Sequence, residues 1–226
     1  MANELDLEEQ EQLAELKHFW SQYGNLISWA LIAVFGAIAA WNGWQYWQNS
    51  QAAQSAAMFD EVERAAQAGD VSRVERAFSD MKERFGRTTY AQQAGLLAAS
   101  VLMEQGKADP AKGALAWVAE KASDEGLQSV ARLRLAGVLA DAKAYDEALK
   151  QLSAGFPAEF AALAADRRGD IYNLQGKKAE ARAEYEKAYK SFDERSEYRR
   201  LVEVKLGSMG VDPRQVTPPA AQGTKS

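Results

Sequence analysis

Residues 165–189 read ADRRGDIYNLQGKKAEARAEYEKAY, and this stretch decides the fold. It predicts two helices joined by a short turn at Gly176, where glycine suits a positive φ. Small residues allow two paired helices to approach closely, and an aromatic ring then fills the space between them. The residues of these types are Gly169 and Tyr172 on the first helix, and Ala181, Tyr185 and Ala188 on the second.

Two weaker copies of this unit lie upstream. The nearer one, residues 131–152, carries Ala136, Leu139, Tyr145, Ala148 and Leu152, and Ala148 precedes Ala181 by 33 residues. The fainter copy carries Ala99, Leu102, Gly106 and Ala114, and we expect extra residues at Ala108 to Pro110 to lengthen its turn. Residues 58–85 predict a fourth, degenerate pair. A period near 34 residues is typical of helical repeats that stack into a curved solenoid.

Short turns with Gly, Asp or Pro divide the chain after Trp47 into helix-length segments. The predicted helices are residues 50–67, 71–85, 89–105, 110–122, 127–141, 145–153, 158–175, 178–191 and 195–206. No strand is predicted, so the fold class is all-α. The repeats resemble the tetratricopeptide repeat (TPR), although Gly95, Arg132 and Ala165 stand near the place of its large aromatic residue. The alternative is a generic helical bundle with accidental periodicity.

A membrane anchor precedes the repeats. Residues 26–47, LISWALIAVFGAIAAWNGWQYW, carry no charge and match the roughly 20 residues that cross a bilayer. Aromatic residues that favour the headgroup region flank this segment on both sides, namely Trp20, Tyr23, Trp41, Trp44, Tyr46 and Trp47. One alternative is a cleaved signal peptide ending near Ala37-Ile38-Ala39, but the preceding region is long and acidic rather than short and basic. The others are a buried core helix, disfavoured by aromatic residues at both edges of the run, and an interfacial helix, which would need a charged face.

The charge is concentrated in the tail that precedes the anchor. Residues 1–25 hold six acids and one base, Lys17, while the other 201 residues balance 26 bases with 26 acids. This balance argues against a nucleic-acid-binding protein. The first base after the anchor is Arg64, so Lys17 favours a cytoplasmic amino terminus. The predicted layout is an acidic cytoplasmic tail (1–25), a transmembrane helix (26–47), a TPR-like repeat domain (48–210) and a disordered tail (211–226).

Catalytic motifs are missing from the sequence. There is no cysteine, the single histidine, His18, lies in the tail, and no Gly-rich phosphate loop occurs. The acidic pairs Asp124-Glu125 and Asp193-Glu194 fall at predicted turns or helix starts, where they favour the helix dipole. We therefore predict a protein that is not an enzyme and that needs no cofactor or metal.

A partner segment is expected on the concave face of the solenoid, which the first helix of each pair lines. The candidate protein-binding residues are Leu96, Ser100, Met103, Leu133, Leu163, Asp166, Asp170 and Asn173. Most of these positions suit the core or the plain surface equally well.

The acidic tail carries a partial helical stripe of its own. Leu5, Leu13 and Leu16 precede Trp20 at near-helical spacing. Residues 1–20 therefore offer a recognition helix for a cytosolic regulator, although a solvated, frayed tail is the favoured interpretation.

Several features together resemble the YfgM family. They are the acidic tail, the anchor ending in WNGWQYWQ (residues 41–48), and the strings AADRRGDIYNLQGKKAEARAEYEKAY (164–189) and RLVEVKLGSMG (200–210). The resemblance covers nearly the whole chain. It implies an ancillary subunit of the bacterial SecYEG translocon in the inner membrane, with a cytoplasmic tail and a periplasmic repeat domain. It also implies work beside a membrane-anchored periplasmic chaperone (PpiD-like) that assists translocated proteins, and it supplies no catalytic residues.

Three hypotheses follow. The leading one is a membrane-anchored protein–protein interaction scaffold at the translocon. The second is a regulator of an envelope stress response that acts through the cytosolic tail. The third, an accessory of a membrane-bound pathway such as haem synthesis, is disfavoured because such proteins usually carry two membrane spans and this sequence offers one.

Overall fold

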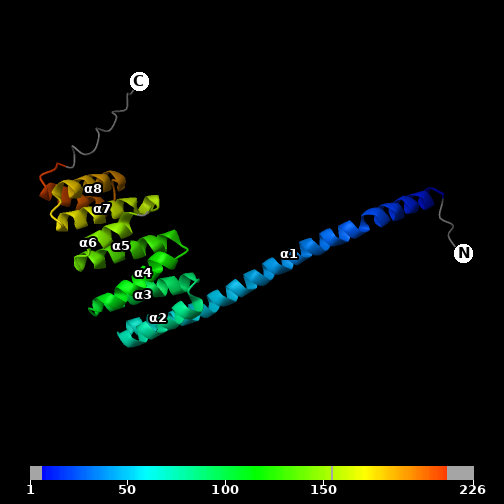
Figure 1. Cartoon of the computed structure of the whole chain (residues 1–226), viewed down its shortest axis with the longest axis horizontal. Coiled ribbons are helices and arrows are strands. Elements are labelled where there is room, and N and C mark those ends of the chain that lie inside the picture. The colour runs from blue at the N-terminus through cyan, green and yellow to red at the C-terminus, as the bar shows by residue number, and fades with distance from the viewer. Residues whose placement is uncertain (1–6, 154, 213–226) are drawn as a thin grey trace, which may run out of the picture. The chain divides into compact units, whose positions relative to one another are not determined.

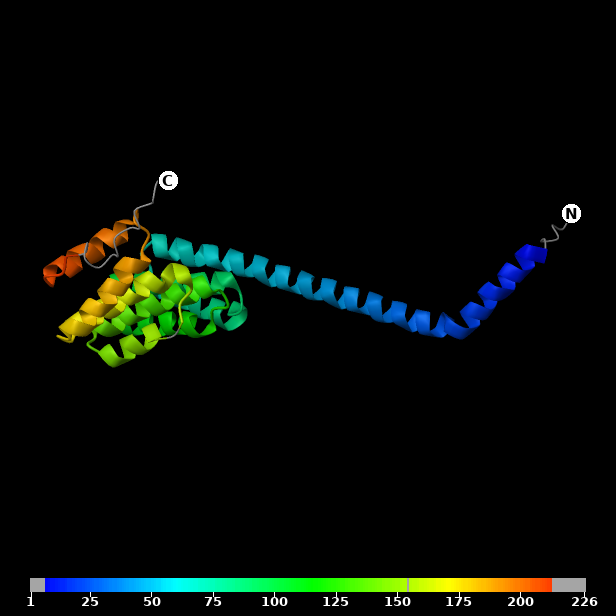
Figure 2. The ribbon, with the colours of Figure 1, turned by 90° about the horizontal axis from the view of Figure 1, so that it is seen from above.

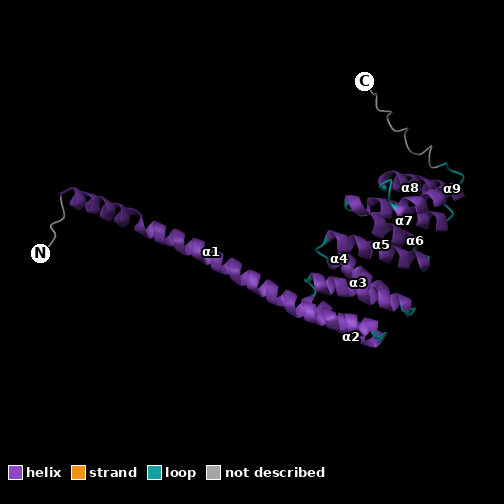
Figure 3. Ribbon diagram, turned by 180° about the vertical axis from the view of Figure 1, so that it is seen from behind, coloured by secondary structure: helices purple, strands orange, loops and turns teal. Residues whose placement is uncertain are grey.

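The computed structural model describes residues 7–153 and 155–212, and every regular element in these ranges is a helix (Figure 3). The all-α prediction is therefore confirmed for the described residues. The helices are α1 (Leu7–Gln67), α2 (Val71–Phe85), α3 (Thr89–Glu104), α4 (Ala108–Lys121), α5 (Glu125–Asp141), α6 (Tyr145–Ser153), α7 (Ala158–Leu174), α8 (Lys178–Ser191) and α9 (Glu197–Ser208).

Helix α1 joins segments that the sequence analysis treated separately. Residues 26–47 and residues 50–67 form parts of one helix, which begins at Leu7. The preference for a frayed tail was therefore wrong for residues 7–20, which are helical, and residues 1–6 lie outside the described part. Among the described helices, α1 is the one that is long and apolar enough to cross a membrane.

The chain divides into two compact units, with the boundary between Gln51 and Ala52. The second unit contains the end of α1 and all later helices. Within it, successive antiparallel helices stack from α2 to α8 (Figure 1), and they overlap when seen from above (Figure 2). The helical ends agree with the predicted ranges to within two residues from α2 onward.

The turn between the two helices of each pair repeats one geometry. A single residue with positive φ closes each of these turns, namely Gly69 (φ 68°), Gly106 (72°), Lys143 (61°) and Gly176 (75°), and Gly210 (76°) takes the same conformation after α9. The prediction for Gly176 is confirmed, since a left-handed backbone is costly for residues that carry a Cβ. The same turn after α9 marks that helix as the first half of a further unit.

These turns correct the register of the fainter copy. Five residues after each of the first four turns comes a residue with no exposed surface, namely Val74, Ala111, Ala148 and Ala181. Ala111, and not Ala114 as predicted, is therefore the equivalent of Ala148. The lengthened turn was also wrong, because Ala108 to Pro110 form the first turn of α4. Proline is tolerated there because an amide in the first turn has no acceptor within the helix.

The equivalent positions Ala111 and Ala148 lie 37 residues apart, whereas Ala148 and Ala181 lie 33 residues apart. Helix α4 has 14 residues and α6 has 9, so the extra residues lengthen a helix rather than a turn. Helix starts are capped as expected from their residue types: Asp70, Thr88 and Asp124 accept a hydrogen bond from the third amide beyond each of them.

Close helix approach depends on glycine at two positions. A Cβ built on Gly169 of α7 would lie 2.5 Å from the ring of Tyr185 on α8. A Cβ on Gly95 of α3 would lie 2.6 Å from Val118 Cγ2 on α4. The expected pairing of a small residue with a ring is thus present at Gly169, where Tyr185 is only 2% exposed.

Helix α9, the last of the described helices, covers one face of α8. Val202 and Leu206 of α9 are buried against Tyr185 and Tyr189 of α8, and Val211 belongs to the same cluster with 7% exposure. The packed structure therefore includes Val211, which the sequence analysis assigned to a disordered tail. The prediction for residues 213–226 concerns a part of the chain outside the described residues.

We expect Gly169→Ala to lower the free energy of unfolding by about 1–3 kcal/mol, because the new methyl group overpacks against Tyr185. Gly113→Ala is the matched control, since Gly113 lies on the exposed face of α4 and a Cβ built on it would have no atom within 4 Å. The control should stabilise by about 0.5–1 kcal/mol through helix propensity. Thermal unfolding followed by circular dichroism measures both, and equal effects of the two substitutions would contradict the packing argument.

Candidate protein-binding groove

Two adjoining clefts cross the first helices of neighbouring repeats. One, of about 280 Å³, lies between α3 and α5, and its lining includes Met103, Leu115, Val138 and Asp141. The other, of about 400 Å³, lies between the end of α1, α3 and α5, and its lining includes Phe59, Gln93, Leu96 and Leu97. Ser100 and Arg134 line both clefts. We name the combined cleft the α3–α5 groove.

The repeat packing creates this groove. The buried residues of α3 and α5 face their partner helices, so Leu96, Ser100 and Met103 on the other side of α3 remain accessible between the two first helices. Arg134 crosses from α5 toward α3, and its Nη1 donates to the carbonyl oxygen of Leu96 at 3.5 Å. The guanidinium thus divides an otherwise mostly apolar surface.

Charges in the groove come from α5 and α7. Arg134 and Asp141 lie seven residues apart on α5, a rise of about 10 Å. Arg167 of α7 also borders this surface. Gly137 lines the first cleft, and a Cβ built on it would lie 3.9 Å from Arg167 Nη1. An apolar floor with charges of both signs at its edge suits an extended apolar polypeptide segment, whose backbone and polar ends need hydrogen-bonding partners.

The structure brings together only some of the predicted binding residues. Leu96, Ser100 and Met103 line the α3–α5 groove. Leu133 is half-buried against the main core, and Leu163 is half-buried on α7. Asn173 is exposed and accepts a hydrogen bond from Lys178 at 2.6 Å. A role in partner binding stays a prediction for all eight residues.

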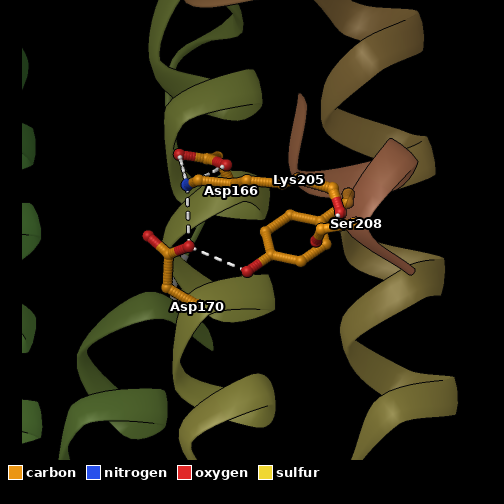
Figure 4. A network of polar contacts seen from close by, with 5 residues as sticks. Asp166, Asp170, Lys205 and Ser208 are labelled. Atoms are coloured by element: carbon orange, nitrogen blue, oxygen red, sulfur yellow. Dashed lines mark hydrogen bonds and ion pairs between the residues drawn. The ribbon is translucent and has the colours of Figure 1, made fainter. Parts of the chain in front are cut away.

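Asp166 and Asp170 are engaged by helix α9. Lys205 Nζ lies 2.7 Å from Asp166 Oδ1 and 2.7 Å from Asp170 Oδ1, and it points between the two carboxylates (Figure 4). The Tyr185 hydroxyl donates to Asp170 Oδ1 at 2.8 Å. Both carboxylates therefore hold the last helix of the stack, and this engagement was not foreseen from the sequence.

Burial shifts the pKa of Asp166 and of Tyr185 in this cluster. Desolvation raises the pKa of Asp166 above its ordinary value, although the hydrogen bond from Lys205 opposes the shift. Burial and the hydrogen bond to Asp170 raise the pKa of Tyr185, so its hydroxyl stays a donor. One lysine thus faces two carboxylates in a partly desolvated site.

No group of three His, Asp or Glu side chains in the described part of the chain is arranged to hold a metal ion.

Comparison with known proteins supports the repeat assignment. A family described as "Tetratricopeptide repeat-like domain" matches residues 17–211. A relative from Neisseria gonorrhoeae is 32% identical over 204 residues, which cover 90% of this chain and 98% of the relative. The chain belongs to the YfgM family.

Other members of the family are more distant. The relative from Escherichia coli is 26% identical over 203 residues, covering 90% of this chain and 97% of its own length. The relative from Haemophilus influenzae is 27% identical over 185 residues, covering 82% of this chain and 90% of its own. All three relatives bear the name "Ancillary SecYEG translocon subunit". The resemblance stated from the sequence is thereby confirmed.

Several charged and aromatic residues that shape these sites were not predicted from the sequence of this YfgM-family chain. Phe59, Arg134 and Asp141 line the α3–α5 groove, and Lys205 binds the two aspartates of α7. The seven-residue spacing of Arg134 and Asp141 places them on one helical face, which was a usable signal. Lys205 lies 35 residues from Asp170, and no local pattern links residues so far apart.

We expect Lys205→Met to lower the free energy of unfolding at neutral pH by about 1–3 kcal/mol, because two carboxylates then face each other without a cation. A carboxyl group with a raised folded-state pKa contributes stability that is present below its unfolded value and is lost as the pH rises through the folded pKa. Removing Lys205 raises the pKa of Asp166 further, so the variant should recover on acidification.

Thermal unfolding in detergent at pH 7.5 and pH 4.5 measures the effect. The gap between wild type and Lys205→Met should narrow at the lower pH. Lys187→Met, on the exposed face of α8, should differ little from wild type at either pH. A gap that stays constant or widens on acidification would rule out the two-carboxylate explanation.

Proposed function

We propose that this chain is an ancillary subunit of the SecYEG translocon that presents a protein-binding repeat domain beside the membrane. One observation carries the proposal: relatives of that name match 90% of this chain and at least 97% of their own length in two species. Because the match includes anchor and repeats, the two parts act together in one role.

The proposed arrangement follows the charge and apolar pattern. Residues 26–47 span the inner membrane once, residues 1–25 lie in the cytoplasm, and the repeat domain from residue 48 to residue 210 lies in the periplasm. Lys17 before the anchor and the lack of any base from Leu26 to Glu63 support this orientation. The domain therefore works where polypeptides emerge from the translocon.

The α3–α5 groove is the proposed binding surface. Its occupant is an extended segment of a membrane-anchored periplasmic chaperone (PpiD-like) that assists translocated proteins. The apolar floor formed by Phe59, Leu96 and Met103 supports this choice, since apolar anchors dominate the energy of peptide-sized interfaces. Anchoring both proteins in one membrane raises their effective concentration, so a weak contact suffices. No chemical step is required of the chain.

The cytosolic tail remains a second candidate site. Leu13, Leu16 and Trp20 are largely exposed on the helical tail, at a spacing that places them on one face. This observation favours recognition of a cytosolic regulator through residues 1–20 as an additional role. Such a role and the scaffold role separate experimentally, because only the former needs the tail.

Affinity purification after mild detergent extraction tests the proposal. Wild type should recover translocon subunits together with a periplasmic chaperone. Met103→Glu combined with Ser100→Arg should reduce recovery of the chaperone about tenfold or more, which corresponds to losing roughly 1.4 kcal/mol at the groove. Deletion of residues 1–20 should leave both recoveries unchanged and abolish only binding of a cytosolic regulator.

Ala116→Glu, on the exposed face of second helix α4, is the matched control and should behave like wild type. Circular dichroism of each variant checks that the repeats remain folded. Failure of wild type to recover any translocon subunit would overturn the proposed assignment. Unchanged chaperone recovery with the groove variant would overturn the choice of binding surface.

Topology reporters test the orientation separately. Alkaline phosphatase fused after Ser208 should be active, because that enzyme folds in the periplasm, and a fusion after Trp20 should be inactive. A green fluorescent protein fusion after Trp20 should be fluorescent. The reverse pattern would place the repeat domain in the cytoplasm and contradict the proposal.

A further inference from the structure

The turn between α2 and α3 carries a group of exposed bases. Lys82 and Arg84 lie in the last turn of α2, and Arg87 follows the helix end, with Glu83 as the one acid among them. We name these three bases the basic turn. Bases at a helix carboxyl end also favour the helix dipole, which accounts for Lys82 and Arg84 but not for Arg87 beyond the last helical residue.

The basic turn keeps its charge available. Within the described residues, the ion pairs of Lys and Arg with Asp and Glu do not include Lys82, Arg84 or Arg87. The Arg84 guanidinium lies 5.2 Å from the centre of the Phe85 ring, which leaves its outer edge in solvent. All three bases are exposed. They can therefore meet an anion from outside the domain.

Contacts inside the repeat domain hold this turn against Ser55, which lies close to the anchor in sequence. The hydroxyls of Thr88 and Ser55 form a hydrogen bond at 2.7 Å, and Ser55 is fully buried. The Phe59 and Tyr90 rings also pack together, with centroids 6.0 Å apart. Ser55 follows Trp47 by eight residues within helix α1, a rise of about 12 Å.

Other turns at the same end of the helix pairs are not basic. The turn between α4 and α5 carries Lys121 against Glu120, Asp124 and Glu125. The turn between α8 and α9, with the last turn of α8, carries Lys190 and Arg195 against Asp193 and Glu194. Of these three turns, the one between α2 and α3 is the one with an excess of bases, and Thr88 links it to Ser55, which lies close to the anchor in sequence.

We propose that the basic turn binds the headgroups of anionic phospholipids, such as phosphatidylglycerol, in the leaflet that the anchor leaves. Guanidinium groups bind phosphate oxygens with two hydrogen bonds each, and bases near an anionic surface are attracted to it. Tyr90, partly exposed at the same turn, adds a ring that favours the headgroup region. The contact goes beyond the proposed translocon role and does not depend on it.

Hydrogen exchange of the full chain in nanodiscs tests the proposal. One set of nanodiscs contains phosphatidylcholine alone, and the other also contains phosphatidylglycerol as the anionic component. Amides at the start of α3, such as those of Thr89 and Tyr90, have no acceptor within the helix and exchange fast enough to respond. Phosphatidylglycerol should slow exchange in residues 82–90 about fivefold or more and leave residues 120–128 unchanged.

Variants separate lipid binding from a structural role. Arg84→Gln with Arg87→Gln should remove the effect of phosphatidylglycerol, whereas Arg195→Gln, at the turn between α8 and α9, should retain it. Glu83→Gln should strengthen it, an outcome that no loss of folding can mimic. Glycerol phosphate added to phosphatidylcholine nanodiscs should have no effect, because a free anion lacks the surface density of a bilayer.

Two results would overturn the proposal: no effect of phosphatidylglycerol on wild type, or an effect that persists in the Arg84→Gln and Arg87→Gln variant. An equal effect of free glycerol phosphate would assign the turn to soluble phosphate compounds instead of lipid. Purified nanodiscs contain no translocon, so a negative hydrogen-exchange result would not bear on the proposed function. Likewise, failure to recover translocon subunits by affinity purification would not bear on lipid binding.

Discussion

Close packing of a small residue against a large ring is the constraint on which this structure depends. A single helix pair cannot bury its apolar stripes, so each pair must contact the next one at short range. At Gly169 the missing Cβ leaves space for Tyr185, and at Gly95 it leaves space for Val118 and Phe78. These contacts set how closely α7 approaches α8 and α3 approaches α4, which are the two helices of one pair in each case.

The groove follows from the way in which neighbouring helix pairs stack. When the buried faces of α3 and α5 pack against second helices, their opposite faces are left side by side with a cleft between them. Leu96 and Phe59 reach both the core and the cleft, since each packs against the buried cluster and lines the groove. The groove thus has an apolar floor that includes Leu96 and Met103, with Arg134 across it.

Different contacts cover the two described ends of the repeat domain. At the carboxyl end, α9 covers Tyr185 and Tyr189, and Lys205 neutralises the two aspartates of α7. At the other end, the hydroxyls of Ser55 and Thr88 tie the start of α3 to α1. A solenoid needs both closures, because an end repeat lacks the neighbour that buries the apolar face of an inner one.

The sequence by itself determined the features that depend on near neighbours in the chain. Helix ends followed from caps and turns, the positive φ at Gly176 followed from its residue type, and the anchor followed from an uncharged run of residues. Tertiary structure decided which faces the helices use. Of the eight predicted binding residues, Leu96, Ser100 and Met103 line the groove, while Asp166 and Asp170 bind Lys205. Periodicity places a residue on a helical face, but only packing between distant helices decides what that face meets.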